Sequence, residues 1–279
     1  MRLCSIASGS SGNCIYVGSD ATNLLIDTGI SGKKVEFGLN SLDLTTKDLN
    51  GIFVTHEHSD HIKGVGVFSR RYRLPVFANE KTWHAMAHRL GKIAPRHQQV
   101  FRNEEVFVFQ DLEVLPFSTY HDAADPVGYR FVSEGQQVSI LTDTGQLDAR
   151  MVDAIRGSDV YYLEANHDPI LLQEGPYPQV LKQRIRSAYG HLSNQQAAEV
   201  LCEVLEGRGE AVLLAHLSEE NNTPQLCRST IVGLLAQEGL DVQRDQRILV
   251  CSRFSPSPWQ ACLPKEAHPA VWAAAEAGR

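Results

Sequence analysis

The residues with the clearest chemical potential lie between His56 and His61, where three histidines and an aspartate share one short segment. Imidazole and carboxylate groups are common ligands of zinc, manganese and iron. Side chains two positions apart on an extended segment point the same way, so we expect His56 and His58 to converge on one ion. Asp60 and His61 would face another. The alternative is a polar loop that is rich in histidine by chance.

This cluster follows residues 51–55, a β-branched and apolar run that predicts a buried strand. Other His and Asp residues also stand directly after predicted strands, where a rigid scaffold meets solvent. Alone, Asp143 or His216 fits an ordinary loop equally well. Together with the first cluster they provide enough ligands for two metal ions, namely His56, His58, Asp60, His61, His121, Asp143 and His216.

The order of the predicted elements indicates two sheets between layers of helices. Strands are expected over residues 2–7, 13–18, 23–27, 51–55, 106–109, 112–117, 138–142, 159–164, 211–215 and 248–252. Helices are expected over residues 32–39, 62–72, 80–90, 147–155, 193–205 and 224–237. The last two have clear starts, with Ser193 as an N-cap and Thr223 followed by Pro224.

Length and composition fit a soluble globular protein of 279 residues. The sequence has neither an apolar segment behind a basic N-terminus nor the run of about 18 apolar residues that a membrane helix needs. We therefore expect a cytoplasmic protein with no membrane partner. The six cysteines are scattered without a Cys-x-x-Cys pair, so His and Asp are the expected metal ligands.

The formal net charge of −7 argues against broad, nonspecific adhesion to nucleic acid. Local basic clusters are nevertheless present, and each fits either a solvated surface or a phosphate-binding patch. They are Arg70, Arg71 and Arg73; Arg89, Lys92, Arg96 and Arg102; and Lys182, Arg184 and Arg186. A phosphate-rich substrate is therefore compatible with the sequence.

The ordered ligand series resembles that of the metallo-β-lactamase superfamily, whose α/β fold is an αββα four-layer sandwich with the site at one edge. The resemblance covers about residues 1–253 and implies one hydrolase domain there, with the Pro- and Ala-rich residues 254–279 as a partly disordered surface tail. It implies that one ion is held by His56, His58 and His121. The second would be held by Asp60, His61 and His216. Asp143 would bridge the two ions, and Asp27 would support the ligand loop.

Flanking segments narrow the resemblance to the YycJ (WalJ) group, whose members resemble exonucleases acting on DNA. These segments are residues 8–13, 56–64, 121–129, 164–168, 190–194 and 216–222. Glu164 and His191 also resemble positions in ribonuclease Z, where Glu164 would support the site. Leu163, however, stands where those relatives have a histidine, which argues against tRNA 3′ processing. The stretch from Asp143 to His191 is too short for the extra domain of the ribonuclease J and SNM relatives.

The expected function is a two-metal-dependent phosphodiesterase, a 5′-to-3′ exonuclease acting on DNA in repair or processing. The cofactors are expected to be two divalent ions of zinc, manganese or iron, with a hydroxide between them attacking the phosphodiester. Asp60 would also orient this nucleophile. His191 would contact the phosphate or act as a general acid, with His167 as second choice. A buried histidine bonded to backbone also explains either position.

Four residues are expected to bind substrate, namely Ser10, Ser11, Asn13 and Asn194. Backbone N–H groups of residues 8–13 suit a phosphate, and a plain hairpin turn fits the same segment equally well. The rival functions are a small-molecule hydrolase, either a cyclic phosphodiesterase or a glyoxalase II-like thioesterase, and a ribonuclease. A binding module with a decayed metal site is a further alternative.

Overall fold

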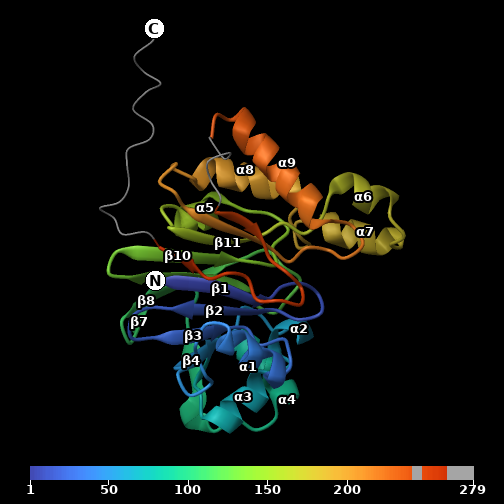
Figure 1. The fold of residues 1–279 in the computed structure, drawn as a ribbon. Coiled ribbons are helices and arrows are strands. Elements are labelled where there is room, and N and C mark those ends of the chain that lie inside the picture. The colour runs from blue at the N-terminus through green and yellow to red at the C-terminus, as the bar shows by residue number, and fades with distance from the viewer. Residues whose placement is uncertain (241–246, 263–279) are drawn as a thin grey trace.

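The structure is a computed structural model that describes residues 1–240 and 247–262. Figure 1 shows four layers, in which two sheets pack face to face and helices cover both outer faces. The order of the predicted elements indicated two sheets between layers of helices, and this prediction is confirmed. Among the described residues, none of the helices has the length and apolar composition needed to cross a membrane.

The first sheet has seven strands in the order β14-β1-β2-β3-β4-β5-β6. Neighbours are antiparallel from β14 to β3 and parallel from β3 to β6. The strands are β1 (Arg2–Ala7), β2 (Cys14–Gly18), β3 (Asn23–Ile26), β4 (Gly51–Phe53), β5 (Val76–Asn79), β6 (Gln98–Phe101) and β14 (Gln260–Ala261).

The second sheet also has seven strands, in the order β13-β12-β11-β10-β9-β8-β7. They are β7 (Phe107–Phe109), β8 (Leu112–Ser118), β9 (Val127–Ser133), β10 (Gln136–Leu141), β11 (Val160–Glu164), β12 (Ala211–Ala215) and β13 (Ile248–Val250). The strands from β10 to β13 are parallel, so their carboxyl ends meet at one edge. Asp143 and His216 follow two of these ends, and Glu164 closes a third.

Helices α1 (Gly32–Asn40), α3 (Val65–Tyr72) and α4 (Glu80–Leu90) cover the first sheet, and α5 (Ala149–Ile155), α8 (Asn194–Val204) and α9 (Pro224–Gln237) cover the second. The short α2 (Ser59–Ile62) carries Asp60 and His61. In Figure 1, α6 (Pro169–Glu174) and α7 (Gln179–Arg186) lie beside the second helical layer. A single 3-10 turn spans Pro95–His97.

An apolar core between the sheets fixes the platform from which the loops project. Phe53 of β4 stacks on Phe77 with ring centroids 4.4 Å apart and meets Tyr129 and Phe131 of the second sheet edge-on at 5.7 Å. Burial of such rings supplies most of the packing free energy at about 25 cal/mol per Å². Both sheets therefore hold their strand ends in a fixed relation.

The structure differs from the expected elements in several places. The helix expected over residues 62–72 is divided at Gly64, where an added Cβ would lie 2.8 Å from the Thr28 carbonyl oxygen. The strand expected over residues 51–55 ends at Phe53, because both the N–H and the hydroxyl of Thr55 bond to Asp27. The elements that were not expected are β5, β6, β9, β14, α6, α7 and the 3-10 turn.

Part of the expected tail belongs to the first sheet. Ser257 N donates to Ser5 O at 2.8 Å, Cys262 N donates to Met1 O at 3.0 Å, and β14 pairs with β1. The apolar Cys262 is buried against the core between the sheets, which explains why this segment packs. Residues 263–279, the remainder of the expected tail, lie outside the described residues.

Candidate metal centre

Loops from both sheets meet at one edge and enclose a cavity of about 180 Å³. The cavity is lined by residues of the loops that follow strands β4, β8, β10 and β12. These strand ends are where the sequence analysis expected the ligands. Its lining residues are Ser10, His58, Asp60, His61, His121, Asp143, Arg184, His191 and His216. Histidines and carboxylates therefore dominate the wall of this cavity.

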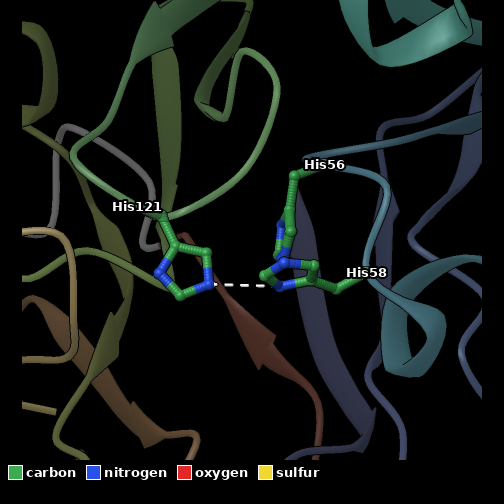
Figure 2. A group of neighbouring side chains, drawn as sticks. All are labelled: His56, His58 and His121. Carbon is green, nitrogen blue, oxygen red and sulfur yellow. Dashed lines mark hydrogen bonds between the residues drawn. The ribbon is translucent and has the colours of Figure 1, made fainter. Parts of the chain in front are cut away.

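Three histidines form one side of the site (Figure 2). His56 and His58 come from the loop after β4 and His121 from the loop after β8, and each offers a nitrogen within 4.8 Å of the other two. His121 Nε2 lies 3.3 Å from His58 Nδ1. Burial lowers the pKa of His56 well below its ordinary value and also lowers the pKa of His121, so both rings are neutral, as metal binding requires.

The polar atoms of this group fit a metal ion. His56 Nδ1 lies 3.0 Å from the Thr55 hydroxyl, but its Nε2 is buried and has no hydrogen-bond partner among the described residues. A buried polar atom without a partner costs free energy, and a coordinated ion removes that cost. The resemblance assigned His56, His58 and His121 to the first ion, and their nitrogens lie close enough together to bind a single ion.

Asp143 lies between two further histidines. Its Oδ2 is 2.9 Å from His61 Nε2, and its Oδ1 is 2.5 Å from His216 Nδ1. His61 Nε2 also lies 3.5 Å from Asp60 Oδ2. Donor atoms of His56, His61 and Asp143 fall within 4.8 Å of one another, so Asp143 reaches both halves of the cluster. This is the position expected of a bridging carboxylate.

Asp27 supports the ligand loop, as the resemblance implied. It accepts hydrogen bonds from Thr55 N at 2.8 Å and from the Thr55 hydroxyl at 2.7 Å, and its Oδ2 lies 2.6 Å from His61 Nδ1. Burial lowers the pKa of His61, but the carboxylates of Asp143 and Asp27 outweigh burial and raise this pKa well above its ordinary value. Asp27 thereby fixes the ring so that Nε2 faces the cavity.

Asn13 lies beside the loop that carries Asp60 and His61. It is buried, its Nδ2 lies 2.9 Å from His61 Nε2 and 3.3 Å from Asp60 Oδ2, and its Oδ1 accepts from Gly9 N at 2.8 Å. Its backbone N–H also donates to the Asp60 carbonyl at 2.7 Å. Asn13 therefore contacts the ligand loop, whereas substrate binding by it remains a prediction.

Glu164 holds His191 at the rim of the cavity. Glu164 Oε1 lies 2.7 Å from His191 Nδ1, while its Oε2 accepts from Thr144 N at 3.0 Å and from Leu192 N at 3.4 Å. Burial disfavours the charged ring, yet the charge and hydrogen bond of Glu164 raise the pKa of His191 to about 9. Donor atoms of Asp143, Glu164, His191 and His216 also fall within 4.8 Å of one another. Backbone N–H groups occupy Glu164 Oε2, and Oε1 contacts His191. We therefore propose that Glu164 orients His191.

Two expected site residues lie behind the cavity rather than on its wall. His167 is buried beside Ser193, and burial lowers its pKa to about 4. The side chain of Asn194 is buried and exchanges hydrogen bonds with Asn222 at 3.2 and 2.9 Å. Proton transfer by His167 and substrate binding by Asn194 remain predictions. The exposed Ser11 does not line the cavity, whereas Ser10 does.

Arg184 is a site residue that was not singled out from the sequence. It lines the cavity from α7, where its Nε donates to Asp122 Oδ2 at 2.6 Å and its Nη2 donates to Asp122 Oδ1 at 3.0 Å. A signal was present, because Asp122 follows the expected ligand His121 and Arg184 belongs to a basic cluster. Asp122 and Arg184 are distant in sequence, and only the position of α7 brings them together.

Comparison with known proteins gives the family of this chain. A family model described as a beta-lactamase superfamily domain matches residues 22–217. The chain is 44% identical to Exodeoxyribonuclease YycJ of Bacillus anthracis over 237 residues, which cover 85% of this chain and 90% of that protein. It belongs to the YycJ/WalJ family of the metallo-β-lactamase superfamily. The predicted resemblance is thus confirmed.

A second relative and a solved structure support the same family and fold. Exodeoxyribonuclease WalJ of Streptococcus pneumoniae is 42% identical over 255 residues, which cover 91% of this chain and 95% of that protein. The crystal structure of the metallo-beta-lactamase fold protein YhfI from Bacillus subtilis superposes with a TM-score of 0.68 at 14% identity, covering 92% of this chain and 98% of YhfI. The αββα sandwich predicted for the family is therefore confirmed.

Proposed function

We propose that this member of the YycJ/WalJ family is a two-metal-dependent phosphodiesterase that removes nucleotides from the 5′ end of DNA. The observation that carries the proposal is Asp143, which lies 2.9 Å from His61 and 2.5 Å from His216 with different oxygens and also joins the group around His56. The similar proteins YycJ and WalJ bear the name exodeoxyribonuclease. On this proposal the enzyme acts in the cytoplasm, in DNA repair or processing.

The donor set suits divalent ions of zinc, manganese or iron. His56, His58 and His121 would hold one ion; Asp60, His61 and His216 would hold the other; Asp143 would contact both. Such ions supply Lewis acidity, which lowers the pKa of water and neutralises negative charge on a phosphate. Two aspartates offset only part of the charge of two dications, so the site would attract an anionic phosphodiester.

The protein's own side chains would position the substrate. Because Glu164 engages His191 Nδ1, the Nε2 atom is left to contact the phosphate or to give a proton to the leaving 3′-oxygen. Arg184 brings a planar cation to the same cavity, and Asp122 holds that plane in place. Asp60 is half-buried at the cavity wall and would orient the attacking water.

The size of the cavity favours a strand over a small molecule. Pockets that enclose a whole small ligand measure about 300–1,000 Å³. The cavity of about 180 Å³ is smaller and suits the entry of one phosphodiester while the remainder of the strand stays outside.

The direct test incubates the purified protein, loaded with Mn²⁺ or Zn²⁺, with linear DNA and measures released nucleotides. We expect release by the wild-type protein and none by His58→Ala or Asp60→Ala, because each change removes a ligand from a different ion. Absence of release from the wild-type protein with every metal would refute the proposal. Equal release by all three proteins would do so as well, since the activity would then come from a contaminant.

A further inference from the structure

A second cavity, of about 210 Å³, lies on the other side of the loop after β1. Its floor is apolar and is formed by the buried Ile6, Ala7 and Ile30. Its walls carry Phe37 of α1 and Phe254, whose side chains are 66% and 69% exposed. Exposed apolar side chains that gather in one patch mark binding sites more often than single exposed side chains do. Two of them over one apolar floor indicate a binding site for a flat, apolar face.

Cations surround these rings. Lys33, Lys34 and Arg253 line the same cavity, and Lys34 Nζ lies 5.8 Å from the centroid of the Phe254 ring. Lys33 and Lys34 stand in the first turn of α1, the end of a helix that favours anions. Lysine and arginine beside exposed aromatic rings are the recurring features of sites for single-stranded nucleic acid, because bases stack and phosphates pair with the cations.

Residues that line this cavity lie close along the chain to residues that line the metal cavity. Ala7 lines it, and Ser10, three residues on, lines the metal cavity, so at most about 11 Å of extended chain separates them. Arg253 connects the two, because its Nη2 donates to Leu217 O at 2.9 Å, next to the ligand His216. The same guanidinium packs against Gly9 and lies 3.4 Å from Glu219 through Nη1.

We propose that the cavity between Phe37 and Phe254 binds a nucleobase of single-stranded DNA adjacent to the phosphate that reacts at the metal centre. The inference rests on the proposed function and adds to it a substrate class, an unpaired strand end. The base lies over Ile6 and Ile30 between the two rings, and the flanking phosphates lie against Lys33, Lys34 and Arg253. The three cations favour this polyanion over an apolar protein segment as the occupant.

The test measures binding of a fluorescein-labelled single-stranded oligonucleotide to the full-length protein in EDTA, where no cleavage occurs. Phe37→Ala and Phe254→Ala are expected to weaken binding about tenfold each, because each removes one stacking face. Phe254→Leu, which keeps an apolar side chain of similar size, is expected to weaken binding as well. Trp259→Ala is the matched control, since Trp259 is 50% exposed and lies outside the cavity. Its binding is expected to equal that of the wild-type protein.

A second arm places a single abasic nucleotide at successive positions from the 5′ end. The wild-type protein is expected to lose affinity at one position, and Phe254→Ala is expected to be insensitive to that same change, because the base and the ring act as a pair. Equal sensitivity of both proteins at every position would overturn the inference. So would unchanged binding by Phe37→Ala and Phe254→Ala.

A control measurement separates this inference from the proposed function. The ring variants are expected to keep the metal content of the wild-type protein, because neither ring lines the metal cavity. If the wild-type protein neither binds DNA nor releases nucleotides, the proposed function fails. If the wild-type protein does both and the ring variants behave identically, only the nucleobase site is wrong.

Discussion

Asp27 Oδ2 lies 2.6 Å from His61 Nδ1, and both side chains are fully buried. This contact sets the direction in which His61 Nε2 faces the cavity. Asp27→Asn keeps the size of the side chain but removes its charge, so we expect metal affinity to fall about 10- to 100-fold at the site that contains His61. Metal content after dialysis against a graded chelator measures this loss.

Asp111→Asn is the control for that change, because Asp111 also accepts hydrogen bonds from hydroxyl groups but lies away from the cavity. Its metal content is expected to match that of the wild-type protein. Unaltered metal binding by Asp27→Asn would show that the carboxylate does not orient the ligand.

Arg184 is expected to bind a substrate phosphate. Arg184→Ala should raise KM for DNA about tenfold with a smaller effect on kcat, because a charge-assisted hydrogen bond to substrate is lost. The slope of log affinity against log salt should fall by about one. Arg186→Ala on the same helix is the control, since Arg186 contacts Gln173 and does not line the cavity. Identical salt slopes for both variants would contradict this role.

Glu164 is expected to act through His191. Glu164→Gln should lower kcat about 10- to 100-fold with little change in KM or metal content, because the ring loses its oriented, charged partner. Adding His191→Gln to that variant should lower kcat little further, since both changes disable one unit. Independent, multiplying losses in kcat would argue that the 2.7 Å contact is only structural.

Gly29 is required by the close approach of the Asp60 loop. A Cβ at Gly29 would lie 1.5 Å from the Asp60 carbonyl oxygen, so Gly29→Ala should destabilise the fold by about 3 kcal/mol and displace the Asp60 loop. In the described part of the chain, nothing beyond the backbone of α9 itself lies within 4 Å of a Cβ added at Gly233, so Gly233→Ala should stabilise the protein by about 0.5–1 kcal/mol. Urea unfolding measures both. Similar unfolding midpoints for the two variants would contradict the close packing seen at Gly29.

Sequence periodicity and strand-end chemistry predicted much of this protein. The strands Arg2–Ala7 and Ala211–Ala215 and the helices Glu80–Leu90 and Pro224–Gln237 have the expected bounds, because each combines a clear apolar pattern with a local start or stop signal. The expected ligands were recognised in the sequence for a related reason. Histidine and aspartate directly after an apolar run are conspicuous, and parallel strands bring such positions to one edge.

Features that depend on tertiary packing were not predictable from the same patterns. Asp27 ends β4 early by capturing Thr55, and Asn13 lies against His61 from a loop distant in sequence. The strand Gln260–Ala261 is too short to show a pattern and exists through its pairing with β1. Arg184 reaches the cavity only because α7 lies beside the second layer of helices, a position that no local signal encodes.

The most direct test of the central claim is a time course on DNA labelled at either the 5′ or the 3′ end, single- and double-stranded, with an RNA strand of the same sequence as control. With the metal-loaded protein, we expect immediate release of the 5′ label as a mononucleotide and progressive shortening of the 3′-labelled strand. Both are expected to be lost with His58→Ala. Immediate release of the 3′ label, internal cleavage first, or equal degradation of RNA would contradict it.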